Sequence, residues 1–240
     1  MRDVSGETAA EKRLVMSTQT AVGAIADNYI GMQTMTDIAR AVGAKCFPLG
    51  VDIYSNPVII AEDLTPAAVS APLSRYANAI SGGFSYNGRP CSILISNGKV
   101  VCGESCHYWT NGKPESVLYR LYDGTFGIKR VMAVGDLPSG VKWAVGGLGL
   151  MSHLDPATEG FVGAYSDVLR KTNHTMVGYK GHHVYLCYCK AMTAGQVNDY
   201  AKKLKLDNAV MLDGGHIAAI NSESTKINTS QKQFYIVQGV

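Results

Sequence analysis

Three short turns constrain the fold of this chain most strongly. Each contains a glycine and lies between two apolar segments of strand length. Asn-Gly and Asp-Gly are the dipeptides most typical of tight β-hairpins, because both residues tolerate a positive φ. The predicted hairpins join 92–96 to 99–102 through Asn97-Gly98, 117–122 to 125–131 through Asp123-Gly124, and 176–179 to 183–189 through Lys180-Gly181. Three such turns predict a largely antiparallel sheet.

Two segments are expected to be helical. Thr193 and Gln196 form a Thr-x-x-Gln capping box, and apolar residues follow at helical spacing, namely Val197, Tyr200, Ala201 and Leu204. The second predicted helix spans 64–78, where Thr65 can cap and Pro66 suits the first turn. Together with the hairpins, these segments predict the α+β class: a twisted, largely antiparallel or mixed sheet with a few covering helices.

The clearest candidate for chemistry follows the first of these helices. An apolar run at 209–212 ends in Asp213-Gly214-Gly215-His216. A strand that ends in a carboxylate and then bends through two glycines can present an acid or base, and the turn can receive an anion or a sugar. The alternative is a plain Asp-Gly-Gly turn in which the carboxylate caps the next segment.

A second glycine pair lies at Ser81-Gly82-Gly83. Glycines after an apolar segment can expose backbone N–H groups to a phosphate, and the serine hydroxyl can add one hydrogen bond. Taken alone, the pattern favours a bulge or a tight bend.

These motifs and several others occur in the same order as in the phosphodiester glycosidase family, which the chain resembles over about residues 45–240. The matching segments are Ala79-Ile80-Ser81-Gly82-Gly83-Phe84, Ile95-Ser96-Asn97-Gly98-Lys99-Val100-Val101, Trp143-Ala144-Val145-Gly146-Gly147, His174-Thr175-Met176-Val177-Gly178, Leu212-Asp213-Gly214-Gly215 and the closing Phe234-Tyr235-Ile236-Val237.

The resemblance implies a hydrolase that cleaves a glycosyl phosphodiester by glycosidase-type chemistry, with no metal and no cofactor. It implies catalytic roles for Asp213, His174, His216 and Asp52, the last as the second carboxylate that glycosidases use. It implies that substrate is bound by Ser81, Gly82, Gly83, Thr175, Gly147, Gly214 and Gly215. The expected partner is a sugar phosphodiester or a phosphoglycan.

Three pocket positions depart from the family pattern. The family has Asn at the position of Ser81, Arg at that of His174, and Gly-Ser-Ser in place of the run that begins at His216. Exchanging an arginine for a histidine makes the hold on phosphate depend on pH, so it is expected to strengthen as the imidazole is protonated. The departures support an alternative function: a phosphoglycan- or nucleotide-sugar-binding module that has lost the reaction, with a virion or cell-wall association. Whether the chain is an enzyme stays open at this point.

Composition restricts the partners. The net charge is only +3 and no dense run of Lys and Arg occurs, so a nucleic-acid polymer is not an expected partner. No apolar run has the length of a membrane span, and Asp3, Glu7 and Glu11 fall where a signal peptide would be apolar. A cytoplasmic or virion-associated protein is therefore expected unless a signal was removed. The six cysteines lack paired C-x-x-C spacing and are expected to be buried, unbridged side chains.

Residues 1–44 lie outside the resemblance. They are rich in Ala, Thr and Met and end in a helical pattern at 36–42 closed by Gly43. This region is expected to form a helical arm, which could mediate homo-oligomerisation or pack on the domain formed by 45–240.

Overall fold

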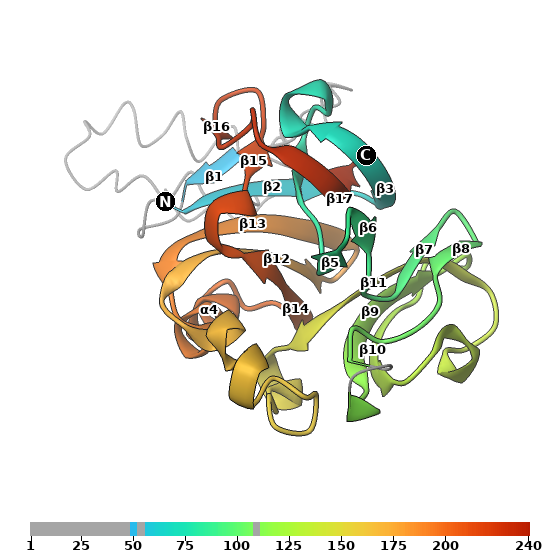
Figure 1. The fold of residues 1–240 in the computed structure, drawn as a ribbon. Coiled ribbons are helices and arrows are strands. Elements are labelled where there is room, and N and C mark those ends of the chain that lie inside the picture. The colour runs from blue at the N-terminus through green and yellow to red at the C-terminus, as the bar shows by residue number, and fades with distance from the viewer. Residues whose placement is uncertain (1–48, 52–55, 108–110) are drawn as a thin grey trace, which may run out of the picture.

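The computed structural model describes residues 49–51, 56–107 and 111–240, and antiparallel strands dominate this part of the chain (Figure 1). The predicted arm at 1–44 and the candidate Asp52 lie outside the described residues. Whether 45–240 forms a domain separate from the arm therefore stays a prediction.

The larger sheet has ten strands. Its path runs through β1 (Leu49–Val51), β2 (Pro57–Ala61), β13 (His183–Met192), β12 (Thr172–Lys180), β14 (Asn208–Gly214), β11 (Val141–Gly149), β7 (Leu94–Ser96) and β8 (Lys99–Cys102). β9 (Glu115–Leu121) pairs with β11, and β10 (Phe126–Val131) pairs with β9. All of these pairings are antiparallel.

The second sheet has five strands, in the order β16 (Lys226–Ile227), β15 (Ile220–Asn221), β4 (Ala79–Ser81), β17 (Lys232–Gly239) and β3 (Leu64–Pro72). A small ribbon pairs β5 (Ser85–Tyr86) with β6 (Arg89–Pro90). In Figure 1 the five-stranded sheet lies at the top, β12–β14 cross the middle and β7–β10 lie at the lower right.

The three predicted hairpins are confirmed. β7 and β8 meet with Ser96 opposite Lys99, and Asn97 and Gly98 have φ values of 47° and 75°, as a tight hairpin turn requires. β9 pairs with β10 across the Asp123-Gly124 turn, and β12 pairs with β13 with Lys180 opposite His183. In each hairpin, the predicted turn residues join the two paired strands.

The predicted helix after Thr193 is confirmed as α4 (Ala194–Lys203). The Thr193 hydroxyl accepts the Gln196 N–H at 3.3 Å, and the Gln196 side chain accepts the Thr193 N–H at 2.9 Å. Val197, Tyr200 and Ala201 are buried against apolar residues of β12–β14. The opposite face of these strands packs on the five-stranded sheet, so this part of the larger sheet is buried on both sides.

The predicted helix at 64–78 is wrong. Its first part is the strand β3, followed by a 3-10 turn at Leu73–Arg75. β3 is the edge of the five-stranded sheet and pairs only with β17, from Gly239 opposite Leu64 to Lys232 opposite Pro72. An edge strand tolerates Pro66 and Pro72 because a proline there removes no N–H from the paired side.

This correction changes the fold class. Within the described residues α4 is the α-helix, and the remaining helical pieces are short 3-10 turns. The expected α+β class is therefore wrong, and the described chain is mostly β with large antiparallel sheets. Pairing between distant strands overrode the local helical signal of 64–78.

Candidate functional site

Asp213 lies at the end of β14, as the sequence predicts. The side chain is half-buried, and its Oδ1 accepts the N–H of Gly214 at 2.7 Å. Burial and, to a smaller extent, the nearby Asp167 raise the pKa of this carboxyl to about 6, although the Gly214 N–H, His216 and Arg170 oppose the rise. A carboxyl with this pKa changes charge close to neutral pH, which is the range in which acid–base and charge-stabilising groups work.

The two glycines after Asp213 are required by their surroundings. A Cβ on Gly214 would lie 2.5 Å from Nδ1 of His174, which is opposite it in the strand register. Gly215 has a φ of +75°, and a Cβ built on it would lie 3.4 Å from Nη2 of Arg170. The turn therefore brings the backbone of Gly215 close to the guanidinium of Arg170.

Arg170 and Asp167 are the functional candidates that sequence reasoning missed. Arg170 follows the 3-10 turn at Gly163–Leu169, and its Nη1 donates to the Asp167 carboxylate at 2.7 Å. Both side chains are largely exposed. The available signal was an arginine four residues before His174, at a position that matches none of the family motifs. We call Asp167, Arg170, Asp213, Gly214, Gly215 and His216 the Asp213 cluster.

His174 lies behind this cluster and is fully buried. Its Nε2 is 3.2 Å from the carbonyl oxygen of Arg170. Burial lowers the pKa of His174, and the charge of Arg170 also lowers it, although backbone carbonyls oppose the shift. The imidazole is therefore neutral at neutral pH and contacts the backbone that carries Arg170.

Ser81 and Thr175 are also fully buried and join the two sheets. The Thr175 hydroxyl donates to the carbonyl of Ser81 at 3.0 Å, and the Ser81 hydroxyl accepts the N–H of Ala219 at 3.1 Å. Thr175 Oγ1 also lies 3.4 Å from the carbonyl oxygen of Asp213. These hydroxyls therefore hold the strand that presents Asp213 and face protein groups.

The other glycines predicted to bind substrate are close-packed. The ring of Tyr235 fills the place of a Cβ on both Gly82 and Gly83, and a Cβ on Gly147 would lie 2.5 Å from the carbonyl oxygen of Met211. Gly82 and Gly83 line a cavity of about 70 Å³ together with Ile217, which follows His216. The structure thus gathers the predicted residues around the end of β14, except for Asp52, which lies outside the described residues.

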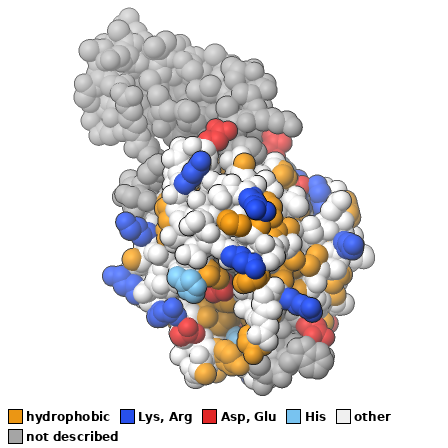
Figure 2. Space-filling view, turned by 45° about the horizontal axis from the view of Figure 1, so that its top comes forward, with side chains coloured by type: hydrophobic (Ala, Val, Ile, Leu, Met, Phe, Trp, Pro, Cys, Tyr) orange, Lys and Arg blue, Asp and Glu red, His pale blue; other side chains and the backbone are white. Residues whose placement is uncertain are grey.

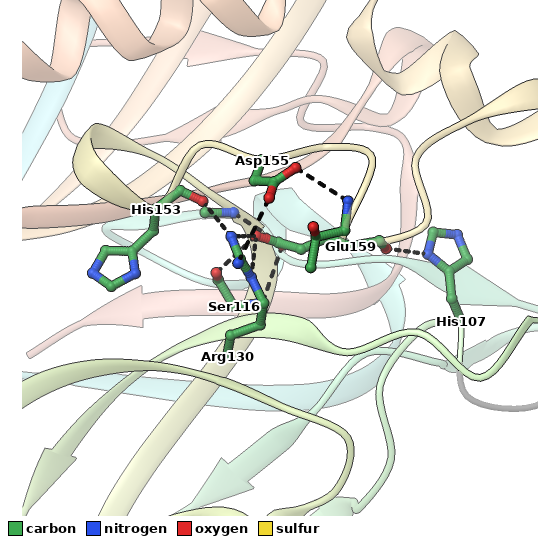
Figure 3. A network of polar contacts seen from close by, with 8 residues as sticks. His107, Ser116, Arg130, His153, Asp155 and Glu159 are labelled. Carbon is green, nitrogen blue, oxygen red and sulfur yellow. Dashed lines mark hydrogen bonds and ion pairs between the residues drawn. The ribbon is translucent and has the colours of Figure 1, made fainter.

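Two further carboxylates are fully buried, and both come from or contact β9. Glu115 accepts the Ile93 N–H at 2.5 Å and the Ser92 hydroxyl at 2.8 Å, and burial raises its pKa to about 7. Glu159 accepts the N–H and hydroxyl of Ser116 and forms an ion pair with Arg130 (Figure 3). Sequence reasoning did not find either group, because nothing local marks a glutamate for burial.

Nothing in the described residues suggests a metal centre: no three His, Cys, Asp or Glu side chains are grouped so as to hold an ion. Cys91, Cys102, Cys106, Cys187 and Cys189 are free thiols, and Cys46 lies outside the described part. Among the described helices, none is both long and apolar enough for a membrane span.

Surface features outside the cluster are less specific. Figure 2 shows Lys and Arg side chains spread singly over one face of the molecule. A cavity of about 610 Å³ lies beside the β7–β8 hairpin and is lined by Asn97, Lys99 and Tyr122 among others. It shares no lining residue with the Asp213 cluster, so its size is no argument about chemistry at Asp213.

Comparison with known proteins identifies the fold. No protein-family profile matches the chain, and no curated protein matches its sequence. Among solved structures, the described β architecture is similar to a glycosidase catalytic domain and to a protein of unassigned function. At the identities found, these matches establish a distant structural relationship and a shared fold.

The first of these is the catalytic domain of zebrafish N-acetylglucosamine-1-phosphodiester alpha-N-acetylglucosaminidase, auto-inhibited by its pro-peptide. The TM-score is 0.56 with 15% sequence identity, and the match covers 80% of this chain and 80% of that chain. The second is a hypothetical protein from Synechocystis, with a TM-score of 0.50, 12% identity, and coverage of 78% of this chain and 60% of that chain.

Proposed function

We propose that the chain is a hydrolase that cleaves the bond between a sugar and a phosphodiester group, with the Asp213 cluster as its active site. The observation that carries this proposal is the half-buried carboxyl of Asp213, whose pKa is raised to about 6, next to an exposed guanidinium. The fold similarity to a glycosidase that acts on an N-acetylglucosamine-1-phosphodiester supports the same reaction class.

Each group has a role that its chemistry suits. Arg170 binds the phosphate, since a guanidinium donates in a fixed fork to two oxygens and stays charged at all relevant pH values. The turn at Gly214 and Gly215 lets the ligand approach the main chain. His216, which is exposed beside Asp213, contacts the sugar or the phosphate. His174 contacts the backbone carbonyl of Arg170 and does not contact the ligand.

The reaction then proceeds as a hydrolysis at the anomeric carbon. The carbon–oxygen bond to phosphate breaks, its electron pair leaves with the phosphate oxygen, and water adds to the carbon and releases a proton. Phosphate is a stable leaving anion, so the step needs little help from an acid. The ionised Asp213 stabilises the positive charge that develops on the sugar ring.

A binding module without turnover is the second candidate. Two observations favour it: the cavity at Gly82 and Gly83 measures only about 70 Å³, and Asp167 already pairs with Arg170 at 2.7 Å. Such a module would use Arg170 for a phosphoglycan and leave the glycosidic bond intact.

The deciding experiment is a panel of glycosyl phosphodiesters, including an N-acetylglucosamine-α-phosphodiester, with product detected by mass spectrometry. The proposed hydrolase releases free sugar from at least one of them, and Asp213→Asn abolishes the release. Saturable binding with no product from any substrate would favour the binding module. Arg170→Ala should weaken binding of the phosphodiester, and Lys171→Ala is its matched control, because it removes the neighbouring exposed cation.

A further inference from the structure

The segment 150–171 connects β11 to β12 and carries Asp167 and Arg170 to Asp213. It contains no strand, only 3-10 turns at Met151–His153 and Gly163–Leu169. Much of its second half is exposed. A segment of this kind needs a fixed attachment point if it is to hold a guanidinium at a defined place.

Glu159 is that attachment point. Although it lies in the middle of the segment, its side chain is fully buried. One carboxylate oxygen accepts the N–H groups of Ser116 at 3.1 Å and Gly149 at 3.2 Å. The other accepts the Ser116 hydroxyl at 2.9 Å and Arg130 Nη2 at 3.1 Å. These donors come from β9, β10 and β11, so a single side chain ties the segment to three strands.

Arg130 extends the attachment along the segment. Its Nη2 also donates to the carbonyl of His153 at 2.8 Å, and its Nη1 lies 3.9 Å from the Asp155 carboxylate. Figure 3 shows the guanidinium between Glu159, Asp155 and the backbone of His153. Gly149 makes room for this arrangement, because a Cβ there would overlap the Ser116 hydroxyl.

Aromatic contacts hold the part of the segment between Glu159 and Arg170. His107 Nδ1 lies 2.8 Å from the carbonyl oxygen of Glu159, and its ring contacts Phe161 at 4.8 Å and Tyr165 at 4.6 Å between centroids. The Phe161 ring in turn contacts Phe84 at 5.3 Å, next to the Gly82-Gly83 pair. The segment is thus held from Glu159 to Tyr165, which lies within the 3-10 turn that precedes Arg170.

We infer that Glu159 is a positioning residue for the proposed active site: by tying 150–171 to the sheet, it sets the place of Arg170 and Asp167 relative to Asp213. This inference rests on the proposed function for its role in catalysis. Glu159 touches no substrate, because it is buried away from the cluster among Ser116, Gly149 and Arg130.

The test uses Glu159→Gln in the full chain, which keeps the shape and removes the charge, and Ser116→Ala, which removes only one hydrogen-bond partner and is the milder variant. We expect KM for the active phosphodiester, and Kd for inorganic phosphate, to rise about tenfold in Glu159→Gln, with a smaller change in kcat. Ser116→Ala changes both constants in the same direction by less.

Asp63→Asn is the matched control. Asp63 is also a partly buried carboxylate that holds an arginine, Arg120, but its side-chain partners in the described residues lie outside 150–171. We expect this variant to lose stability and keep the wild-type KM and phosphate Kd. If Glu159→Gln behaves in the same way, with a lower Tm and unchanged constants, Glu159 is only a structural residue and the inference is overturned.

A measurement that does not require enzymatic activity tests this inference independently of the proposed function. Asp167 raises the pKa of Asp213 and Arg170 lowers it, so displacement of the segment that carries both should change that pKa from about 6. A carbon-13 NMR titration of the Asp213 carboxyl measures this in Glu159→Gln and in Asp63→Asn. An unchanged pKa in Glu159→Gln overturns the inference even if the wild-type protein hydrolyses nothing.

Discussion

Asp63 and Asp213 are two partly buried aspartates whose surroundings have opposite effects. Burial opposes ionisation of Asp63, but Lys142 and Trp143 donate to its two oxygens at 2.5 Å, the Leu64 N–H donates as well, and Arg120 lies 3.0 Å away. Together these partners hold the pKa of Asp63 below its usual value. At Asp213 the effect of burial is larger than that of the groups that favour ionisation, and the pKa rises to about 6.

The difference distinguishes a structural carboxylate from the one that we propose to be catalytic. Asp63 has its charge compensated by two cations and an indole N–H, so it remains ionised and ties the β2–β3 turn to β9 and β11. Asp213 accepts one backbone N–H, and Arg170, whose charge lowers the pKa of Asp213, is already paired with Asp167. An incompletely compensated carboxylate can respond to a positive charge that develops on a ligand.

The largest expected effect is on turnover. Asp213→Asn removes the ionised group and should lower kcat on an active glycosyl phosphodiester by about a thousandfold or more. Asp63→Asn should leave kcat unchanged, because its carboxylate contacts only structural partners. Single-turnover measurements of both variants make the comparison. Equal losses in the two variants would remove the distinction between the two aspartates.

Arg170→Ala should give the next largest effect. Loss of a guanidinium that binds phosphate is expected to weaken binding of inorganic phosphate by about tenfold to a hundredfold. Lys171→Ala removes an adjacent exposed cation and should change the affinity by less than about twofold. Calorimetric titration at fixed ionic strength measures both. If the two variants weaken binding equally, the effect comes from net charge and Arg170 has no specific contact.

The pH profile follows from the raised pKa of Asp213. Above about pH 6 the carboxylate is ionised, so kcat/KM should be level there and fall about tenfold per unit below it. The pKa of His174 is lowered by burial, so this residue adds no charge to offset the fall. The strengthening on acidification expected from the sequence is therefore replaced by a weakening. Activity that increases steadily from pH 7 to pH 5 would show that Asp213 acts in its protonated form.

The smallest effects are on stability, and they have opposite signs. The raised pKa of Asp213 means that its contribution to stability is present below about pH 4 and lost as the pH rises through about 6. Asp213→Asn should therefore stabilise the fold by about 1–2 kcal/mol at pH 8. The pKa of Asp63 is lowered, so its contribution is present at neutral pH and lost on acidification.

Asp63→Asn should consequently destabilise the fold at pH 8 by about 1–3 kcal/mol. Calorimetric Tm values at pH 8 and pH 5 measure both variants, and a shift of about 2–4 °C per kcal/mol is expected for a chain of this size. A decrease in Tm for both variants at pH 8 would mean that Asp213 is also compensated in the folded state.

The features that sequence reasoning recovered are those encoded within a few residues. The Asn97-Gly98 turn requires positive φ at both positions, and the Thr193–Gln196 box satisfies helix N–H groups locally. The position of Asp213 follows from the apolar run that precedes it. In each case, neighbouring residues alone decide the conformation.

Features decided by distant segments were missed. The residues from Leu64 to Pro72 carry a helical signal, but pairing with β17 makes them an edge strand. His174 matches a ligand-binding position of the family, yet a close approach to Gly214 buries it. Arg170 belongs to a segment without strands, which Glu159 attaches to Ser116 and Arg130, two residues that are distant from it in the sequence. Sequence spacing contains no information about these three-dimensional contacts.

The place of β17 between β3 and β4 also has a consequence for the kinetics of folding. Leu64 pairs with Gly239, and Ile80 pairs with Val237, so β3 and β4 join the five-stranded sheet by pairing with a segment that is far away in the chain. Such non-local pairing is slow, because a long loop must be ordered first. During synthesis, β3 and β4 leave the ribosome long before their partner β17, so their apolar side chains stay exposed until β17 has been made. Co-translational chaperone binding should therefore concentrate on this early part of the chain.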